Sequence, residues 1–169
     1  MDRKYIEEIF PQIGKIKSKK LQDSVVKAWL LAVEEGGWDR IDDVPFTLLA
    51  DVEASLIEHT RMVTDMATAI GETRNDLDMD ILIAGALVHD VGKLLEYERR
   101  GETIVKSSYG KLVRHPVSGY GLVLAAGMPI EVAHIVAAHS KEGESVIRSP
   151  EAIVIHHCDF TDFDIARTA

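Results

Sequence analysis

Apolar residues recur every three or four positions along most of the chain, which is the spacing of a helical face. One segment, residues 79–90, is apolar on all sides, as is typical of a central buried helix. The chain is therefore predicted to be all-α. The period, together with its Pro and Gly stops, predicts helices over residues 5–10, 19–35, 53–70, 79–90, 116–126, 129–139 and 150–166.

Residues 97–113 break this helical period. The sequence Arg-Arg-Gly-Glu-Thr at 99–103 is turn-like, and Ile104-Val105 could form one arm of a hairpin. Residues 38–45 are also polar and turn-rich. The pattern predicts a single helical bundle over residues 51–169 with a short irregular or hairpin insertion near 97–113, preceded by an N-terminal helical appendage over residues 1–50.

The composition limits the class of protein and its expected location in the cell. The chain has 169 residues, of which 46% are hydrophobic and 28% charged, as expected for one globular domain with a real core. The longest apolar run, residues 81–88, is too short for a bilayer, and the first residues do not resemble a signal peptide. Because Cys158 is the only cysteine, no internal disulfide can form. We expect a cytoplasmic protein with no membrane partner.

The net charge of −9 argues against attraction of nucleic acid in bulk, although a local phosphate site remains compatible with it. One segment differs from the rest: residues 93–114 carry six basic against three acidic side chains. This segment could cover a site as an anion-attracting gate, or it could be a solvated loop with scattered charge.

Several polar residues fall on apolar helix faces. His59 lies on the stripe of residues 56–70, His139 and Asp159 lie on inner faces of later helices, and His89-Asp90 ends the most apolar helix. Burying such groups without partners costs roughly 2–7 kcal/mol each. A shared cation would explain them together, and imidazole with carboxylate suits iron, manganese, cobalt, nickel or zinc.

Each residue alone allows a simpler interpretation. His59 could be a hydrogen-bonded core histidine, and Asp159 could be exposed if its helix is rotated. The pair His89-Asp90 could simply end a helix, although an aspartate there opposes the helix dipole. The joint pattern favours the metal site.

The motif ALVHDVGK at residues 86–93, with His59 upstream and Asp159 downstream, resembles the His…His-Asp…Asp signature of the HD superfamily of metal-dependent phosphohydrolases. The resemblance covers about residues 53–167. It implies that His59, His89, Asp90 and Asp159 bind a divalent ion. It also implies that Asp90 and Lys93 are catalytic, with Lys93 contacting a substrate phosphate. Lys93 could instead be a solvated lysine at a helix end.

Two further histidines resemble those of the two-metal branches of the superfamily. His115 lies in RHPVSG, where it is predicted to be a helix N-cap, and His139 lies in IVAAHS. The resemblance implies a second ion held by His115, His139 and a bridging Asp90, although His115 could also be a surface residue. Cyclic-dinucleotide phosphodiesterases of the HD-GYP type have a second histidine where this chain has Ser140, and they continue into a GYP segment that is missing here. RNase Y-like proteins match the later motif, but this chain lacks their coil and RNA-binding domain.

The predicted function is therefore hydrolysis of a phosphoester or phosphoanhydride in a small nucleotide or related metabolite, with Lys93 and Arg114 binding the substrate. The alternatives are a non-catalytic, metal-containing module that senses a nucleotide and a purely structural metal site. Residues 1–50 could form the surface of a homo-oligomer or a lid. Structural roles are favoured for His134, His156 and His157. Of these, His156 could line the cavity and support the metal ligands.

Overall fold

The computed structural model describes residues 1–50 and 52–168, so the two ends of the predicted domain, residues 51 and 169, lie outside the described residues. Helices make up most of this chain, which confirms the all-α prediction. The elements in order are α1 (Arg3–Ile9), the 3₁₀ turn η1 (Pro11–Lys15), α2 (Lys19–Gly36), α3 (Leu56–Gly71), α4 (Met79–Val88), α5 (Lys93–Glu96), β1 (Tyr97–Arg100), β2 (Thr103–Lys106), α6 (His115–Ala125), α7 (Ile130–Ala138), the 3₁₀ turn η2 (Lys141–Ser145) and α8 (Pro150–Ala166).

The helices begin where side chains cap their free N–H groups. Ser55 accepts from the N–H of Glu58, and the Glu58 carboxylate accepts from the N–H of Ser55, which forms a capping box at the start of α3. The helix therefore begins at Leu56, after the predicted start at residue 53. At α8, Ser149 caps the helix and Pro150 occupies its first position, as the sequence predicted.

Three local predictions need correction next to the metal motif. Helix α4 ends at Val88, so His89 is its C-cap and Asp90 lies in the following turn. A short helix, α5, begins after the turn of residues 89–92 and was not predicted. His115 is the first residue of α6, and Arg114 occupies the N-cap position that was predicted for His115.

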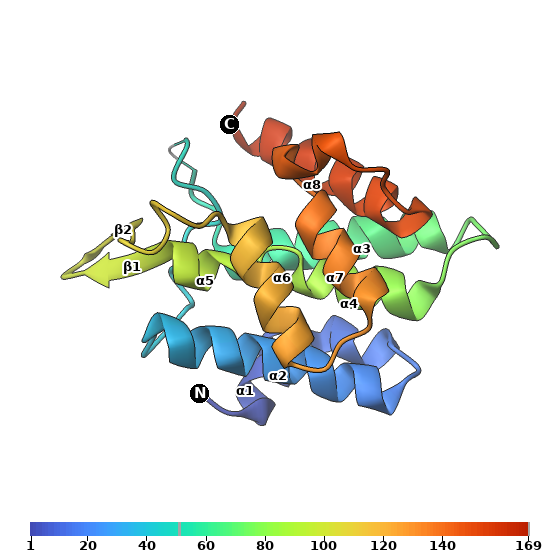
Figure 1. Ribbon diagram of the computed structural model, residues 1–169, viewed down its shortest axis with the longest axis horizontal. Coiled ribbons are helices and arrows are strands. Elements are labelled where there is room, and N and C mark those ends of the chain that lie inside the picture. The colour runs from blue at the N-terminus through green and yellow to red at the C-terminus, as the bar shows by residue number, and fades with distance from the viewer. Residues whose placement is uncertain (51, 169) are drawn as a thin grey trace.

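Helix α4 runs through the centre of the bundle. It contacts α2 on one side and α3 and α8 on the other, and it also contacts α7; Figure 1 shows this layering. Residues 82–88 of α4 are all buried, because neighbours cover every face of the helix. Although α4 is apolar, it has ten residues, and within residues 1–50 and 52–168 no helix is long and apolar enough to cross a membrane.

The first 50 residues pack into the same core as the later helices. The rings of Phe10 and Trp29 pack in a tilted arrangement with centroids 4.6 Å apart, and both residues are fully buried. The indole N–H of Trp29 donates to the carbonyl of Leu87 at 3.0 Å, and that of Trp38 donates to the carbonyl of Leu94 at 2.6 Å. These two bonds tie the N-terminal segment to the chain on either side of Asp90. The domain boundary near residue 50 stays a prediction.

The segment after α5 forms a two-stranded antiparallel hairpin, which confirms the hairpin insertion. Tyr97 pairs with Lys106, and Arg100 pairs with Thr103. The turn contains Gly101 with φ +61°, a conformation that glycine adopts at little cost. The hairpin projects from one end of the bundle (Figure 1).

We expect Trp29→Ala to lower the free energy of unfolding by about 3–5 kcal/mol, because it removes a buried ring and leaves the carbonyl of Leu87 without its donor. Denaturant unfolding of the metal-free protein measures this change. Ile147→Ala is the control, since that side chain is 94% exposed. A loss below 1 kcal/mol for Trp29→Ala would show that the N-terminal helices contribute little to the core.

Candidate metal centre

The six predicted metal ligands converge from five separate regions of the chain. They come from α3, the end of α4, the first residue of α6, the end of α7, and α8. All but Asp159 are buried, and the side chain of Asp159 is 15% exposed. The residues that converge are His59, His89, Asp90, His115, His139 and Asp159.

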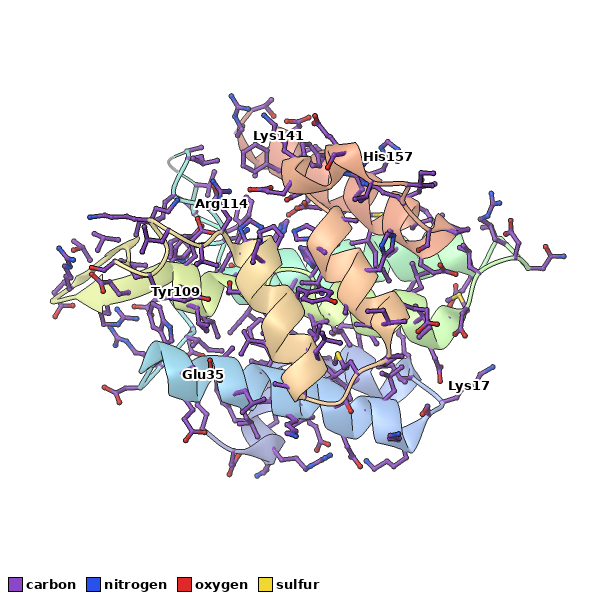
Figure 2. The ribbon with its side chains drawn as sticks, in the orientation of Figure 1. Lys17, Glu35, Tyr109, Arg114, Lys141 and His157 are labelled. Carbon is purple, nitrogen blue, oxygen red and sulfur yellow. The ribbon has the colours of Figure 1, made fainter. Side chains whose placement is uncertain are left out.

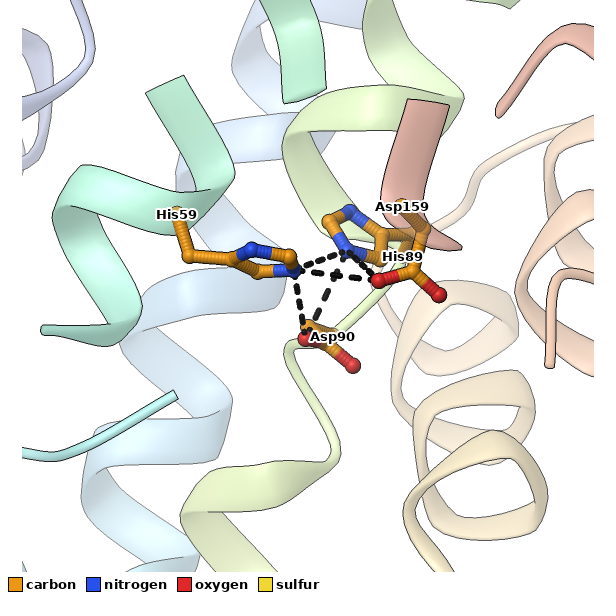
Figure 3. Close-up of side chains that lie close together, drawn as sticks. All are labelled: His59, His89, Asp90 and Asp159. Atoms are coloured by element: carbon orange, nitrogen blue, oxygen red, sulfur yellow. Dashed lines mark hydrogen bonds and ion pairs between the residues drawn. The ribbon is translucent and has the colours of Figure 1, made fainter. Parts of the chain in front are cut away.

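The first group of ligand atoms surrounds one side of Asp90 (Figure 3). His59 Nε2 lies 3.3 Å from His89 Nε2, 3.4 Å from Asp90 Oδ2 and 3.2 Å from Asp159 Oδ1. His89 Nε2 lies 3.4 Å from Asp90 Oδ2 and 4.0 Å from Asp159 Oδ1. Four ligands at about 2.1 Å from a tetrahedral ion would be about 3.4 Å apart, so this spacing suits a transition metal.

The second group uses the other oxygen of the same carboxylate. His115 Nε2 lies 3.3 Å from Asp90 Oδ1, and His139 Nε2 lies 3.5 Å from it. Asp90 therefore presents Oδ2 to one group and Oδ1 to the other. This is the geometry required of a carboxylate that bridges two ions.

Each of the four histidines is anchored through Nδ1 and turns Nε2 toward Asp90. His89 and His139 bind backbone carbonyls through Nδ1, at 2.7 and 2.8 Å, and His59 and His115 bind carboxylates at 2.6 and 2.9 Å. Such bonds fix the orientation of metal-binding imidazoles. Among the described residues, His139 Nε2 is buried without a hydrogen-bond partner, and a metal ion would coordinate its lone pair. The residues thus fit a divalent-metal site.

The electrostatics favour a cation as well. Burial lowers the pKa of His59, but hydrogen bonds with Asp159, Asp162 and Asp90 outweigh it and raise that pKa to about 10. Burial raises the pKa of Asp159, but the bond to His59 and the nearby histidines lower it to about 2. Clustered carboxylates thus create a negative potential, which here attracts protons and would equally stabilise a metal ion.

Lys93 lies beside Asp90 and is neither a solvated lysine nor a free phosphate ligand. Its ammonium donates to a carboxylate oxygen of Asp90 and, at 2.5 Å, to the carbonyl of Phe46. The residue is 8% exposed. The same ion pair helps to hold the pKa of Asp90 well below its usual range despite complete burial.

Three residues that support the ligands were not predicted. Asp162 accepts from His59 Nδ1, and its position three residues after Asp159 on α8 was a usable signal. Glu96 accepts from both the backbone N–H and Nδ1 of His115, at 2.7 and 2.9 Å. Phe46 stacks on His59 with ring centroids 4.4 Å apart. Phe46 lies outside the helical pattern, so nothing local indicated its role.

None of the remaining three histidines belongs to either group of ligands, and two of them have structural contacts. His134 Nε2 accepts from the N–H of Ser149 at 3.1 Å, next to the start of α8. His156 Nδ1 contacts the carbonyl of His139 at 2.6 Å, so it supports a predicted ligand through the backbone. His157 is exposed on the outer side of α8 (Figure 2).

A pocket of about 670 Å³ opens onto Asp90 and Asp159. Lys106 and Arg114 line it, with Lys141 and Arg167, and Figure 2 shows Arg114 and Lys141 on the side facing away from α2. Of the two alternatives for residues 93–114, an anion-attracting gate and a solvated loop, each fits a part: Lys106 and Arg114 line the pocket, but Arg99 and Arg100 do not. Instead, Arg99 pairs with Asp43 and Arg100 pairs with Glu98.

Fold and cluster together define an all-α domain with a histidine–aspartate metal site. The model of the family described as HD domain matches residues 56–164, and the chain belongs to that family. One curated relative is the dihydroneopterin 2′,3′-cyclic phosphate phosphodiesterase of Methanocaldococcus jannaschii, which is 30% identical over 119 residues. The match covers 67% of this chain and 48% of the relative, so the chain spans about half the relative's length. No solved structure gives a significant match.

We expect metal affinity to rise with pH, because a histidine must lose its proton to bind a metal. With its pKa near 10, His59 is protonated at neutral pH in the metal-free protein. The apparent affinity should therefore increase about tenfold per pH unit between pH 6.5 and 8, measured against a competing chelator. Asp162→Asn should flatten this rise, since it removes a carboxylate that holds the proton. An affinity independent of pH in the parent protein would contradict the predicted ligand role of His59.

We also expect two ions per chain at saturating metal. His139→Gln should then remove one equivalent, because the first group of ligands does not include His139. Elemental analysis after gel filtration gives the stoichiometry, and exposed His157→Ala serves as the control. If the parent protein binds one ion at saturating metal, the prediction of a second metal site is wrong.

Proposed function

We propose that this chain is a metal-dependent phosphohydrolase that cleaves a phosphoester or phosphoanhydride bond in a small nucleotide or related metabolite. The observation that carries the proposal is the position of Asp90. Its two oxygens face two groups of histidines, and it lies at a pocket lined by cationic side chains. The family match and the phosphodiesterase relative support the same chemistry.

The metal would be a transition ion such as iron, manganese, cobalt, nickel or zinc. Imidazole and carboxylate ligands without thiolate suit these ions. We assign one ion to His59, His89, Asp90 and Asp159, and a second to Asp90, His115 and His139. Bound there, divalent ions supply Lewis-acid activation of water and of a phosphoryl oxygen.

The chain's own cations would bind and orient the phosphate. Lys93 uses two ammonium hydrogens on Asp90 and Phe46, which leaves a third for a substrate oxygen. Arg114 is 45% exposed and touches Glu96 and Glu142 at 3.3 and 3.5 Å. Because both contacts are long, the guanidinium can turn toward a phosphate with little loss.

The chemistry of the relative supports a small substrate. Its name specifies a cyclic phosphate carried by a pterin compound, which is a single small molecule. The net charge of −9 is consistent with such a substrate and not with long nucleic acid. We therefore place small cyclic and linear phosphodiesters first among the candidates.

We expect Lys93→Met to lower kcat/KM by about a hundredfold while the protein still binds metal, because the lysine stabilises charge on the phosphate. The assay is turnover of a panel of nucleoside cyclic phosphates, nucleotides and dinucleoside polyphosphates with manganese, iron, cobalt, nickel or zinc. Lys111→Met is the matched control, since Lys111 is exposed and does not line the pocket.

One outcome would contradict the role of Lys93, and another would contradict the proposed function. Unchanged turnover in Lys93→Met would remove this lysine from the reaction. If metal-loaded parent protein hydrolyses none of the panel with any of the five metals yet binds one of the compounds tightly, the non-catalytic nucleotide-sensing module becomes the better explanation.

A further inference from the structure

The pocket above the metal ligands has two chemically different halves. Segment 46–49 and helix α8 supply an apolar and aromatic half, whereas β2, the start of α6 and η2 supply a cationic half. The apolar lining residues are Phe46, Leu48, Leu49, Phe160 and Phe163. Lys106, Arg114 and Lys141 line the cationic half, whereas Lys93 lies beside Asp90 and Arg167 follows α8 on the apolar side.

Phe46 is buried, but the other side chains of the apolar half are partly or largely exposed. Leu48 and Leu49 are 40% and 79% exposed, although both line the pocket mouth. Phe160 and Phe163 on α8 are only half-buried. Apolar side chains gathered at a pocket mouth indicate a ligand surface that binding would cover.

The aromatic rings of this half are suited to a flat partner. Phe163 stands edge-on to Phe46, with ring centroids 6.1 Å apart, and the guanidinium of Arg167 lies 5.4 Å from the ring of Phe163. Because Arg167 is exposed, a ligand ring can displace it without breaking a buried contact. A heteroaromatic ring stacks on such side chains whatever its hydrogen-bonding edge.

The cationic half is suited to phosphate. Lys106 and Arg114 share one oxygen of Glu96, at 3.1 and 3.3 Å, so a single carboxylate partners two cations and His115. The pocket is lined by five cationic and four carboxylate side chains. Divalent ions at the cluster would make it strongly positive, in contrast to the net charge of −9 on the whole chain.

We propose that the apolar half is a subsite for a single planar heteroaromatic ring, so that the ligand is a monomeric ring-bearing phosphate ester with its phosphate held at the metal cluster. Leu48, Leu49, Phe160 and Phe163 bind the ring, while Lys106 and Arg114 bind the phosphate side. The volume of about 670 Å³ suits one small ligand, within the range of roughly 300–1,000 Å³ common for such sites. The proposal rests on the proposed function only for the position of the phosphate.

The test compares phosphate monoesters with and without a heteroaromatic ring. Calorimetry with the manganese-loaded protein measures the Kd of guanosine 5′-monophosphate, neopterin phosphate and ribose 5-phosphate. We expect at least one ring-bearing compound to bind tenfold or more tightly than ribose 5-phosphate, because stacking adds to the shared phosphate contact. The two ring-bearing compounds distinguish a purine from a pterin.

Substitutions then locate the ring. Leu49→Ser changes an exposed side chain, so the fold should be retained, and Phe160→Ala opens the α8 side. Each should reduce the preference for the ring-bearing compound at least threefold, with metal content unchanged. Leu112→Ser, at an 88% exposed position that does not line the pocket, is the control and should keep the full preference.

Two results would overturn the subsite. One is equal binding of all three compounds to the parent protein. The other is an unchanged preference for the ring in both pocket variants. Because the readout is binding, a protein that hydrolyses nothing but prefers ring-bearing phosphates would keep the subsite and reject the proposed enzyme, so the two failures are distinguishable.

Discussion

The carboxylate of Asp90 is the group on which the rest of the site depends. It is 1% exposed, yet it stays ionised because Lys93 and the surrounding histidines offset the cost of burial. Four Nε2 atoms from four segments lie 3.3–3.5 Å from its two oxygens. A charge this deeply buried requires partners on every side, and the helices that carry those partners are thereby held in one arrangement.

The surrounding fold places Asp90 in a turn. The chain leaves α4 at Val88, passes through His89 and Asp90, and re-enters a helix at Lys93. Gly92 makes this path possible, because a Cβ there would lie 2.2 Å from the carbonyl oxygen of His115. The close approach brings α6, and with it His115, against the turn. The indole bonds of Trp29 and Trp38 fix the same turn from the other side.

Much of this could be predicted from the sequence, and the reasons are local. Helical period, helix caps and the His-Asp motif are each encoded by a few neighbouring residues, so α3, α4 and α8 could be predicted, and with them the convergence of His59, His89, Asp90 and Asp159. The roles of Glu96 and Phe46 could not be. They depend on how the chain folds back after α5 and α2, and no short spacing encodes that. Lys93 shows the same limit. Its place in the motif three residues after Asp90 is local, but its bond to the Phe46 carbonyl depends on a segment 47 residues away.

The most direct test of the central role of Asp90 is a crystal structure of the manganese-loaded protein with anomalous data collected for the metal. We expect two anomalous peaks, about 3.5–4 Å apart, one beside each oxygen of Asp90. Peaks located elsewhere, or an Asp90 side chain turned away from all bound metal, would contradict the assignment of this carboxylate as the bridge.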